Sequence, residues 1–354
     1  MKIATKLSPV FLLLASTFLA CAQQSGDATQ TVAAGNNKGP LQLYVSATTS
    51  SGEPVTGLSQ NDFQLLDNKS VVSPLSFRAV TGLNAEPPTE VILLVDAVNA
   101  AYTTVAYERD QLQRYLKQND GQLPLPTSLI VFEDENTRVQ TQPTRDGNGL
   151  ANLLNQSVTG LRAINRSQGY WGAADRLSLS TRTLANLAGY ESTRPGRKLL
   201  IWVSPGWPLL TGIRTDMTAR EEESLFQNIV AMSELLHRAH ITLYAVNPLG
   251  MADAGSLRLT YYEEFLKGVK KPQQAVPADL SLQVLAVQSG GLVVNSSNDI
   301  AGLITSCVRD GLSYYELTYQ PQAADGPNDY HSLQVKSDKP GVTVRTRTGY
   351  YAQP

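Results

Sequence analysis

The chain has 354 residues and a formal net charge of -2, and 17% of its residues are charged. This length exceeds the usual size of one hydrophobic core, so we expect one large domain accompanied by a smaller one. The 29 lysines and arginines balance 31 acidic residues, and the absence of a basic excess argues against a nucleic-acid partner.

Residues 1–22 have the features of an export signal. Two lysines near the start precede the apolar run LSPVFLLLASTFLA, and Ala20 and Ala22 occupy the two small positions before a cleavage site. This run is too short for a stable transmembrane helix, and no later apolar run is long enough to span a membrane. Cys21 offers a competing interpretation, a lipid anchor. We expect simple cleavage and a periplasmic or extracellular protein, because the residues before Ala20 suit a lipoprotein signal poorly.

The two ends of the mature chain have a strand-like pattern. Residues 23–40 are small, polar and rich in glycine, which is typical of a disordered linker. Residues 41–85 alternate apolar and polar in LQLYVSA and LSFRAV, and turn sequences divide them into three or four short strands. Alternation returns at residues 312–352, in YYELTYQP, YHSLQVKS and VTVRTRTGYYA, which predicts three more strands. Neither group can bury a core alone, so we predict one sandwich-like β module built by both chain ends.

Residues 86–311 follow a different pattern, in which short apolar strands alternate with helices. This succession predicts an α/β domain with a doubly wound, mostly parallel sheet that is covered on both faces. The polar segment RVQTQP (138–143) suits an edge strand. We expect the other strands at 91–97, 127–133, 198–204, 241–247 and 291–296, and helices near 103–118 and 220–240.

The stretch VILLVDAVNA (91–100) ends an apolar run in Asp96. A run of this kind is typical of a buried parallel strand, and its acid then lies at the carboxyl edge of the sheet. Open α/β sheets bind their ligands at that edge. Asp96 is therefore the first candidate for a functional residue.

Three stretches together, GEPVTGLSQNDFQLLDN, VILLVDAVN and KPGVTVRTRTGYYA, resemble the bacterial exported proteins called VWFA-related, described mainly from Acidobacteria. The resemblance covers nearly the whole mature chain, in the same order. It implies that the central block is similar to a von Willebrand factor A domain, a doubly wound sheet with one short antiparallel edge strand. The family has no established enzymatic activity, and A domains generally bind proteins or matrix, often through a divalent ion at the carboxyl edge of the sheet.

The resemblance implies a cation site made of Asp-x-Ser-x-Ser after the first strand, a threonine from a loop, and an aspartate after the fourth strand. Magnesium needs such hard oxygens in nearly octahedral positions. Asp96 matches the first acid, but Val98 and Ala100 stand at the serine positions and Pro205 stands where the second acid is expected. We therefore expect a degenerate site, with no functional metal and no cofactor, in which Asp96 is a remnant ligand that accepts hydrogen bonds from loop amides.

The candidate binding rim at this edge consists of Asp96, Asn99, Ser204 and Trp207. Trp207, in SPGWPLLTG, is open to two interpretations: it contacts a protein partner, or it packs down and fills the vacated ion pocket. The segments QGYWGAADRL (168–177), interpreted as a second aromatic loop, and 248–279 carry the same ambiguity between partner contact and packing.

Other residues with chemical potential have simpler interpretations. His237 and His240 lie three apart, and we expect them at a solvated helix end rather than in a metal site. Cys307 is expected to be a buried structural thiol. No nucleophile, phosphate-loop or dinucleotide motif occurs in the chain.

These observations predict an exported, non-catalytic protein of the protein-binding or adhesion type, whose partner is an unidentified protein of the cell envelope or its surroundings. Two alternatives stay open. One is a structural component of the envelope without a specific ligand. The other is a hydrolase that uses Asp96 with His237 or Glu263.

Overall fold

The computed structural model describes residues 39–81, 85–133, 137–140, 142–158, 169–208, 217–250 and 260–354. The predicted export signal, Cys21 and most of the predicted linker lie outside these residues. Among the helices described, none is both long and apolar enough to cross a membrane.

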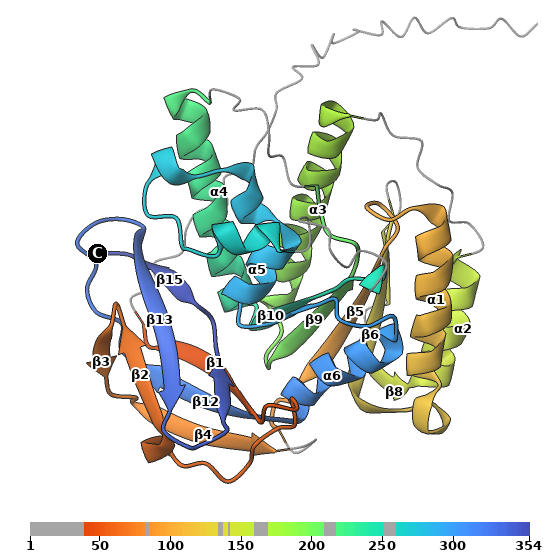
Figure 1. The fold of residues 1–354 in the computed structure, drawn as a ribbon, viewed down its shortest axis with the longest axis horizontal. Helices are drawn as coiled ribbons and strands as arrows, with labels where there is room; N and C mark the ends of the chain where they lie inside the picture. Colours follow the sequence, from red (N-terminus) through yellow and green to blue (C-terminus); the bar gives the residue numbers. More distant parts are fainter. Residues whose placement is uncertain are drawn as a thin grey trace, which may run out of the picture. The chain divides into compact units, whose positions relative to one another are not determined.

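Two four-stranded antiparallel sheets combine strands from both ends of the chain (Figure 1). The first has the order β14-β1-β12-β4 and the second β15-β13-β2-β3. The N-terminal strands are β1 (Leu41–Thr48), β2 (Phe63–Asp67), β3 (Ser70–Val72) and β4 (Ser76–Thr81), and the C-terminal strands are β12 (Ser313–Tyr319), β13 (Asp329–Ser337), β14 (Thr343–Arg345) and β15 (Gly349–Ala352).

Alternation in the sequence produces the core of this β module. In β1, Leu41, Leu43 and Val45 are all buried, and Leu43 lies opposite Leu317 of β12. Leu65 of β2 faces the same core from the second sheet. Because apolar residues from both chain ends fill one core, neither end has a core of its own.

The predicted strand VTVRTRTGYYA is in fact two strands that belong to different sheets. β14 pairs with β1, whereas β15 pairs with β13. Between them the chain turns toward the central domain: Arg345 Nε donates to the Gly290 carbonyl at 2.8 Å, and the Thr348 amide donates to the Gln288 carbonyl at 3.2 Å. The prediction of one continuous strand was wrong because these long-range bonds divide it.

The central sheet is mixed and mostly parallel, with the order β11-β10-β9-β5-β6-β7. β5, β6, β9, β10 and β11 run parallel, while β7 and β8 pair antiparallel with β6. Read from β7, and with the strands other than β8 numbered along the chain, the order is 3-2-1-4-5-6, which is a doubly wound arrangement. The strands are β5 (Glu90–Asp96), β6 (Gln122–Phe132), β7 (Arg138–Val139), β8 (Thr144–Asp146), β9 (Lys198–Val203), β10 (Ile241–Val246) and β11 (Val293–Val294).

Helices cover both faces of this sheet (Figure 1). β5 is buried on both faces, so its side chains enter two separate apolar clusters in alternation: Ile92 and Leu94 in one, Val91 and Leu93 in the other. One face packs against α1 (Tyr102–Leu116), α2 (Gly147–Val158) and α6 (Ile300–Leu312), and the other against α3 (Tyr170–Glu191), α4 (Ala219–Arg238) and α5 (Leu282–Gln288).

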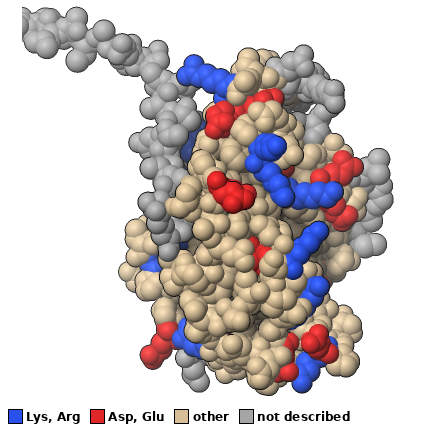
Figure 2. All heavy atoms as spheres, turned by 90° about the vertical axis from the view of Figure 1, so that its left-hand side faces the viewer, with Lys and Arg blue, Asp and Glu red and all other residues tan. Residues whose placement is uncertain are grey.

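The described part of the chain also contains short 3-10 segments. They are η1 (Gln60–Asp62), η3 (Gln118–Gly121), η6 (Tyr261–Phe265), η7 (Pro272–Gln274) and η8 (Pro277–Leu280). In the segment 248–279, Val269, Ala275 and Ala278 are buried, so its described part packs onto the domain, while residues 251–259 lie outside the described residues. On the face shown in Figure 2, acidic and basic side chains are interspersed.

Candidate functional site

Asp96 is the last residue of β5 and its side chain is completely buried. One carboxylate oxygen accepts hydrogen bonds from the backbone amides of Val98 and Asn99, each at 2.9 Å. The other accepts the Asn99 side-chain amide at 2.8 Å and the indole N–H of Trp202 at 2.9 Å. Three of these four donors are amides of the loop after β5, as expected. The fourth, Trp202, was not considered in the sequence interpretation.

Burial and hydrogen bonding act on Asp96 in opposite directions. Burial raises the pKa of the carboxyl group, while the hydrogen bonds from Asn99 and Trp202 lower it, and the net pKa lies above the ordinary value. The four N–H donors occupy the lone pairs that a cation would need. Val98 and Ala100 supply no side-chain oxygen, so the residues present do not fit a magnesium ion.

Trp202 reaches Asp96 because β9 lies beside β5 in the sheet. Its ring meets Phe132 edge-on, with ring centroids 5.6 Å apart, and meets Trp207 edge-on at 5.0 Å. A buried indole N–H needs an acceptor, and Asp96 provides it. The sequence shows a tryptophan within an apolar strand, but its pairing with Asp96 depends on β9 lying beside β5.

Trp207 packs down onto this arrangement. The residue is only 1% exposed, and its indole contacts Trp202. The backbone folds back at Gly206, where φ is +102°, and a Cβ atom there would lie 2.3 Å from the side-chain amide of Gln283. Of the two interpretations left open, the structure shows packing: Trp207 fills space at the edge of the sheet and is not an accessible contact.

The proposed rim is thus largely closed. Asp96, Ser204 and Trp207 are buried, and Asn99 alone among the four candidates is partly exposed. Asn99 donates to both the Asp96 carboxylate and Ser180 of α3, at 2.8 and 2.9 Å. It therefore ties the loop after β5 to the helix layer.

Glu108 of α1 is a second buried acid near this edge that the sequence did not reveal. It is 0% exposed, and neither carboxyl oxygen has a hydrogen-bond partner within the described part of the chain. Burial, followed by the neighbouring charge of Asp96, raises its pKa well above the ordinary value. Among the described residues, no group of three or more His, Cys, Asp or Glu side chains could hold a metal ion.

The residues named for a hydrolase are not assembled. Asp96 ends β5 at the carboxyl edge of the sheet. His237 lies at the end of α4, four residues before Ile241, which begins β10 at the opposite, amino edge of the sheet. Glu263 is exposed in η6. Cys307 is a free thiol, and its burial, which raises its pKa, confirms the prediction that it is buried.

The histidine prediction was wrong in one respect. His237 and His240 do not form a solvated helix end: both are partly buried, and the Tyr44 hydroxyl of β1 lies 3.1 Å from Nδ1 of His240. The sequence could not show that β1, whose Tyr44 lies 196 residues before His240, packs against this helix terminus.

No protein-family model and no curated protein matches this chain. Among solved structures it is similar to the pilus adhesin SpaC from Lactobacillus rhamnosus GG, with a TM-score of 0.36 and 7% identity over 87% of this chain and 48% of that chain. It is also similar to a mutant of the PilB minor pilin from Streptococcus sanguinis, with a TM-score of 0.36 and 8% identity over 64% and 62% of the two chains. A third similarity is to the N-terminal domain of TFIIH p34, with a TM-score of 0.26 and 10% identity over 62% and 96%. This chain thus spans less than two thirds of the adhesin and of the minor pilin.

Proposed function

We propose that this chain is an exported, non-catalytic binding protein of the VWFA-related type, in which the cation site of a von Willebrand factor A-like domain is closed by protein donors. The doubly wound order of the central sheet and its antiparallel edge strand β7 support this proposal. Asp96 ends β5 where β5 meets β9, at the point where the strand order reverses, which is the usual ligand position in such sheets.

The observation that carries the proposal is the complete set of donors on Asp96. Two backbone amides, one side-chain amide and the Trp202 indole satisfy both oxygens. Trp207 then covers Trp202. A partner that binds this protein therefore does so without a bridging cation at this edge.

An exposed aromatic pair at the start of α3 is the surface best suited to such a partner. Tyr170 is 41% exposed and Trp171 75% exposed, and their rings meet edge-on with centroids 5.5 Å apart. Ser180 of the same helix bonds Asn99 at the carboxyl edge of the sheet. At about 1.5 Å per residue, the pair lies roughly 15 Å along the helix from Ser180, away from the end that precedes β9. Exposed aromatic side chains are frequent anchors of protein interfaces.

A binding experiment tests this function. The full mature chain is used to capture proteins from a cell-envelope extract, the captured protein is identified by mass spectrometry, and its affinity is measured for Trp171→Ala. We expect the dissociation constant to rise by about tenfold or more, which is typical of an interface anchor.

Tyr190→Ala is the matched control, since Tyr190 is an aromatic residue of the same helix with 47% exposure, near its other end. We expect it to bind as the unchanged protein does. Equal loss in both variants would contradict the assignment of the surface. Failure to capture any specific partner would instead favour the structural envelope component.

A further inference from the structure

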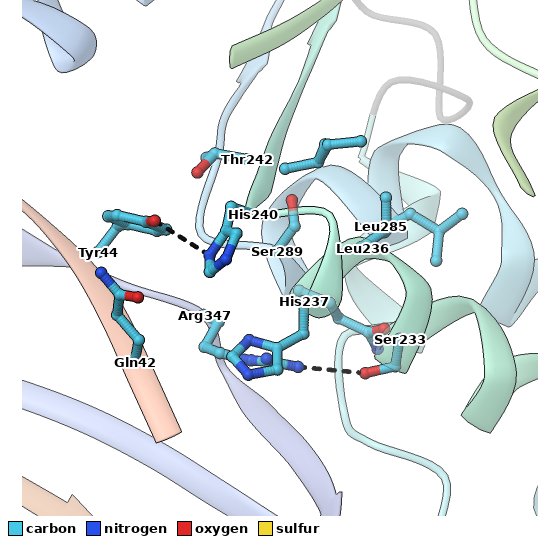
Figure 3. Close-up of a pocket in the computed structure, with 12 residues that line it drawn as sticks. Gln42, Tyr44, Ser233, Leu236, His237, His240, Thr242, Leu285, Ser289 and Arg347 are labelled. Atoms are coloured by element: carbon cyan, nitrogen blue, oxygen red, sulfur yellow. Dashed lines mark hydrogen bonds between the residues drawn. The ribbon is translucent and has the colours of Figure 1, made fainter. Parts of the chain in front are cut away.

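A cavity of about 40 Å³ lies at the amino end of β10, where the β module meets the central domain (Figure 3). One water molecule needs about 10–15 Å³ of such space, so the cavity has room for a small ligand of a few heavy atoms. Its polar lining comes from four separate parts of the chain and includes Gln42, Ser233, His237, His240, Thr242 and Arg347.

Arg347 brings a permanent positive charge to this cavity. Its Nε donates to the Gly349 carbonyl at 2.9 Å, and a terminal nitrogen donates to the Ser233 hydroxyl at 3.4 Å. Burial lowers the pKa of Arg347 to about 10, which still leaves it charged at neutral pH. Within the described part of the chain no carboxylate pairs with Arg347, and the ionisable groups that act on it are the hydroxyls of Tyr319, Tyr330 and Tyr350. A desolvated cation with only neutral partners is unfavourable, and an anion would compensate it.

Two histidines lie beside this charge. His237 is next to the Arg347 guanidinium (Figure 3), and its ring nitrogens have no hydrogen-bond partner among the residues described. Burial lowers the pKa of His237 well below the ordinary value, and the charge of Arg347 and the neighbouring His240 lower it further. Burial likewise lowers the pKa of His240, with a smaller contribution from Lys198. Among the described residues, every charged group that acts on the two rings is therefore basic.

Neutral donors complete the lining. The side chains of Gln42 and Thr242 have no hydrogen-bond partner within the described residues, although both line the cavity (Figure 3). Ser233 and His237 are one turn apart on α4 and so face the same space. Arg347 reaches it because the chain between β14 and β15 leaves the β module at this point.

We propose that this cavity is a binding site for a small tetrahedral oxyanion, such as phosphate or sulfate, held by Arg347 and by the side chains of His237, His240 and Gln42. The planar guanidinium presents several N–H donors in a geometry that suits oxyanions. The site is separate from Asp96 and does not depend on the proposed function. A bound anion favours the charged form of each histidine, so binding takes up protons and strengthens as the pH falls.

The first test uses inorganic sulfate, whose charge is constant between pH 6 and pH 8. Calorimetric titration and thermal unfolding of the full mature chain are compared in sulfate and in chloride at equal ionic strength. Saturating sulfate is expected to raise the melting temperature by about 2–4 °C. Since sulfate also stabilises proteins in general, the comparison with variants decides the result.

Arg347→Gln removes the charge and is expected to weaken sulfate binding by about tenfold or more. Arg238→Gln is the matched control, because Arg238 is an exposed cation at the end of the same helix α4, with 43% exposure of its side chain. This control should bind sulfate as the unchanged protein does. An equal response to sulfate in Arg347→Gln and in the unchanged protein would overturn the proposal, and so would an equal loss in both variants.

A second variant covers the case in which Arg347→Gln fails to fold. His237→Gln removes the titratable ring from a partly exposed position. In the unchanged protein we expect sulfate affinity to increase at least about threefold from pH 7.5 to pH 6, and we expect this increase to shrink in His237→Gln. Affinity that does not change with pH would contradict the role of the histidines. Acetate that binds as tightly as sulfate would exclude a tetrahedral oxyanion as the preferred ligand.

Discussion

The two ends of the central sheet differ in the partners that the protein provides for a buried charged side chain. At the carboxyl end, the two oxygens of Asp96 accept four N–H groups from the protein itself. At the amino end, the Arg347 guanidinium donates to a carbonyl and to a hydroxyl, and His237 lies beside it. Within the described part of the chain no carboxylate pairs with it. The fold alone directs attention to the first end. The number and charge of the hydrogen-bond partners direct attention to the amino end. This comparison of partners is the better guide to where an external ligand would bind.

Removing residues 313–354 should have the largest effect on this comparison. The truncation deletes Arg347 and also takes from β1 both of its partners, β12 and β14. We expect residues 41–81 to become sensitive to protease and sulfate binding to disappear, as measured by limited proteolysis with mass spectrometry and by calorimetry. Continued protection of residues 41–81 would show that the N-terminal strands fold without the C-terminal ones.

Asp96→Ala tests how much the hydrogen bonds on Asp96, at the carboxyl end of the sheet, contribute to stability. It leaves four N–H groups without their acceptor in a buried site, and the expected loss of unfolding free energy is about 3–5 kcal/mol. Asp110→Ala, at an acid whose side chain is 67% exposed, should change stability by less than about 0.5 kcal/mol. Urea unfolding measures both. A loss of similar size in the two variants would mean that the hydrogen bonds on Asp96 contribute little.

Trp202→Phe isolates one of the four donors. It keeps most of the ring but removes the N–H that bonds Asp96, and we expect a loss of about 1–3 kcal/mol. Trp207→Phe is the matched control, because the Trp207 indole nitrogen has no hydrogen-bond partner within the described residues, and its loss reflects ring size alone. If urea unfolding gives the larger loss for Trp207→Phe, packing rather than the hydrogen bond closes this edge.

Glu108→Gln gives a smaller, pH-dependent effect. The pKa of Glu108 is raised in the folded protein, so the folded state holds a proton that the unfolded state releases above about pH 4.3. Its contribution to stability is therefore complete below that pH and is lost as the pH rises toward the folded pKa. Glutamine does not titrate, so the variant should gain stability relative to the unchanged protein from pH 5 to pH 8. Thermal unfolding across this range measures the difference. Parallel pH profiles would contradict a raised pKa.

Magnesium should have the smallest effect. A native site at about one hundred times its dissociation constant would add about 2.7 kcal/mol of stability. Because N–H donors already occupy the Asp96 oxygens, we expect a melting shift below about 1 °C in millimolar magnesium compared with chelator. A shift above about 3 °C that disappears in Asp96→Ala would show that the site binds a cation after all.

The sequence predicted the features that depend on local pattern. The apolar run before Asp96 predicted a buried strand, and β5 is buried as expected. Alternation predicted the strands of the β module, and the apolar neighbours of Cys307 predicted a buried thiol. In each case the residues that determine the structure lie within a few positions of one another.

The features that the sequence did not reveal depend on contacts between distant segments. The side chains that contact Asp96 and Arg347 belong to other elements of the fold. Trp202 of β9 donates a hydrogen bond to Asp96, and Arg347 donates one to Ser233 of α4. QGYWGAADRL was interpreted as a loop, yet Tyr170 and Trp171 begin α3. His240 is paired by Tyr44, 196 residues earlier in the chain. The residue pattern of one segment does not show which side chain from a distant segment will contact it.

The way in which the β module is assembled from both chain ends also affects how the protein folds. Tyr319 and Asp67 are hydrogen-bonded across 252 residues, and Leu58 and Tyr315 across 257. Such high contact order slows folding, because the entropy cost of closing a long loop comes before the favourable free energy of strand pairing. During synthesis the first four strands emerge long before their partners exist, whereas the α/β block between them can form from neighbouring segments. We therefore expect the central block to fold first and the β module to close last, so that a growing chain carries unpaired strand edges until the C-terminal strands have been synthesised.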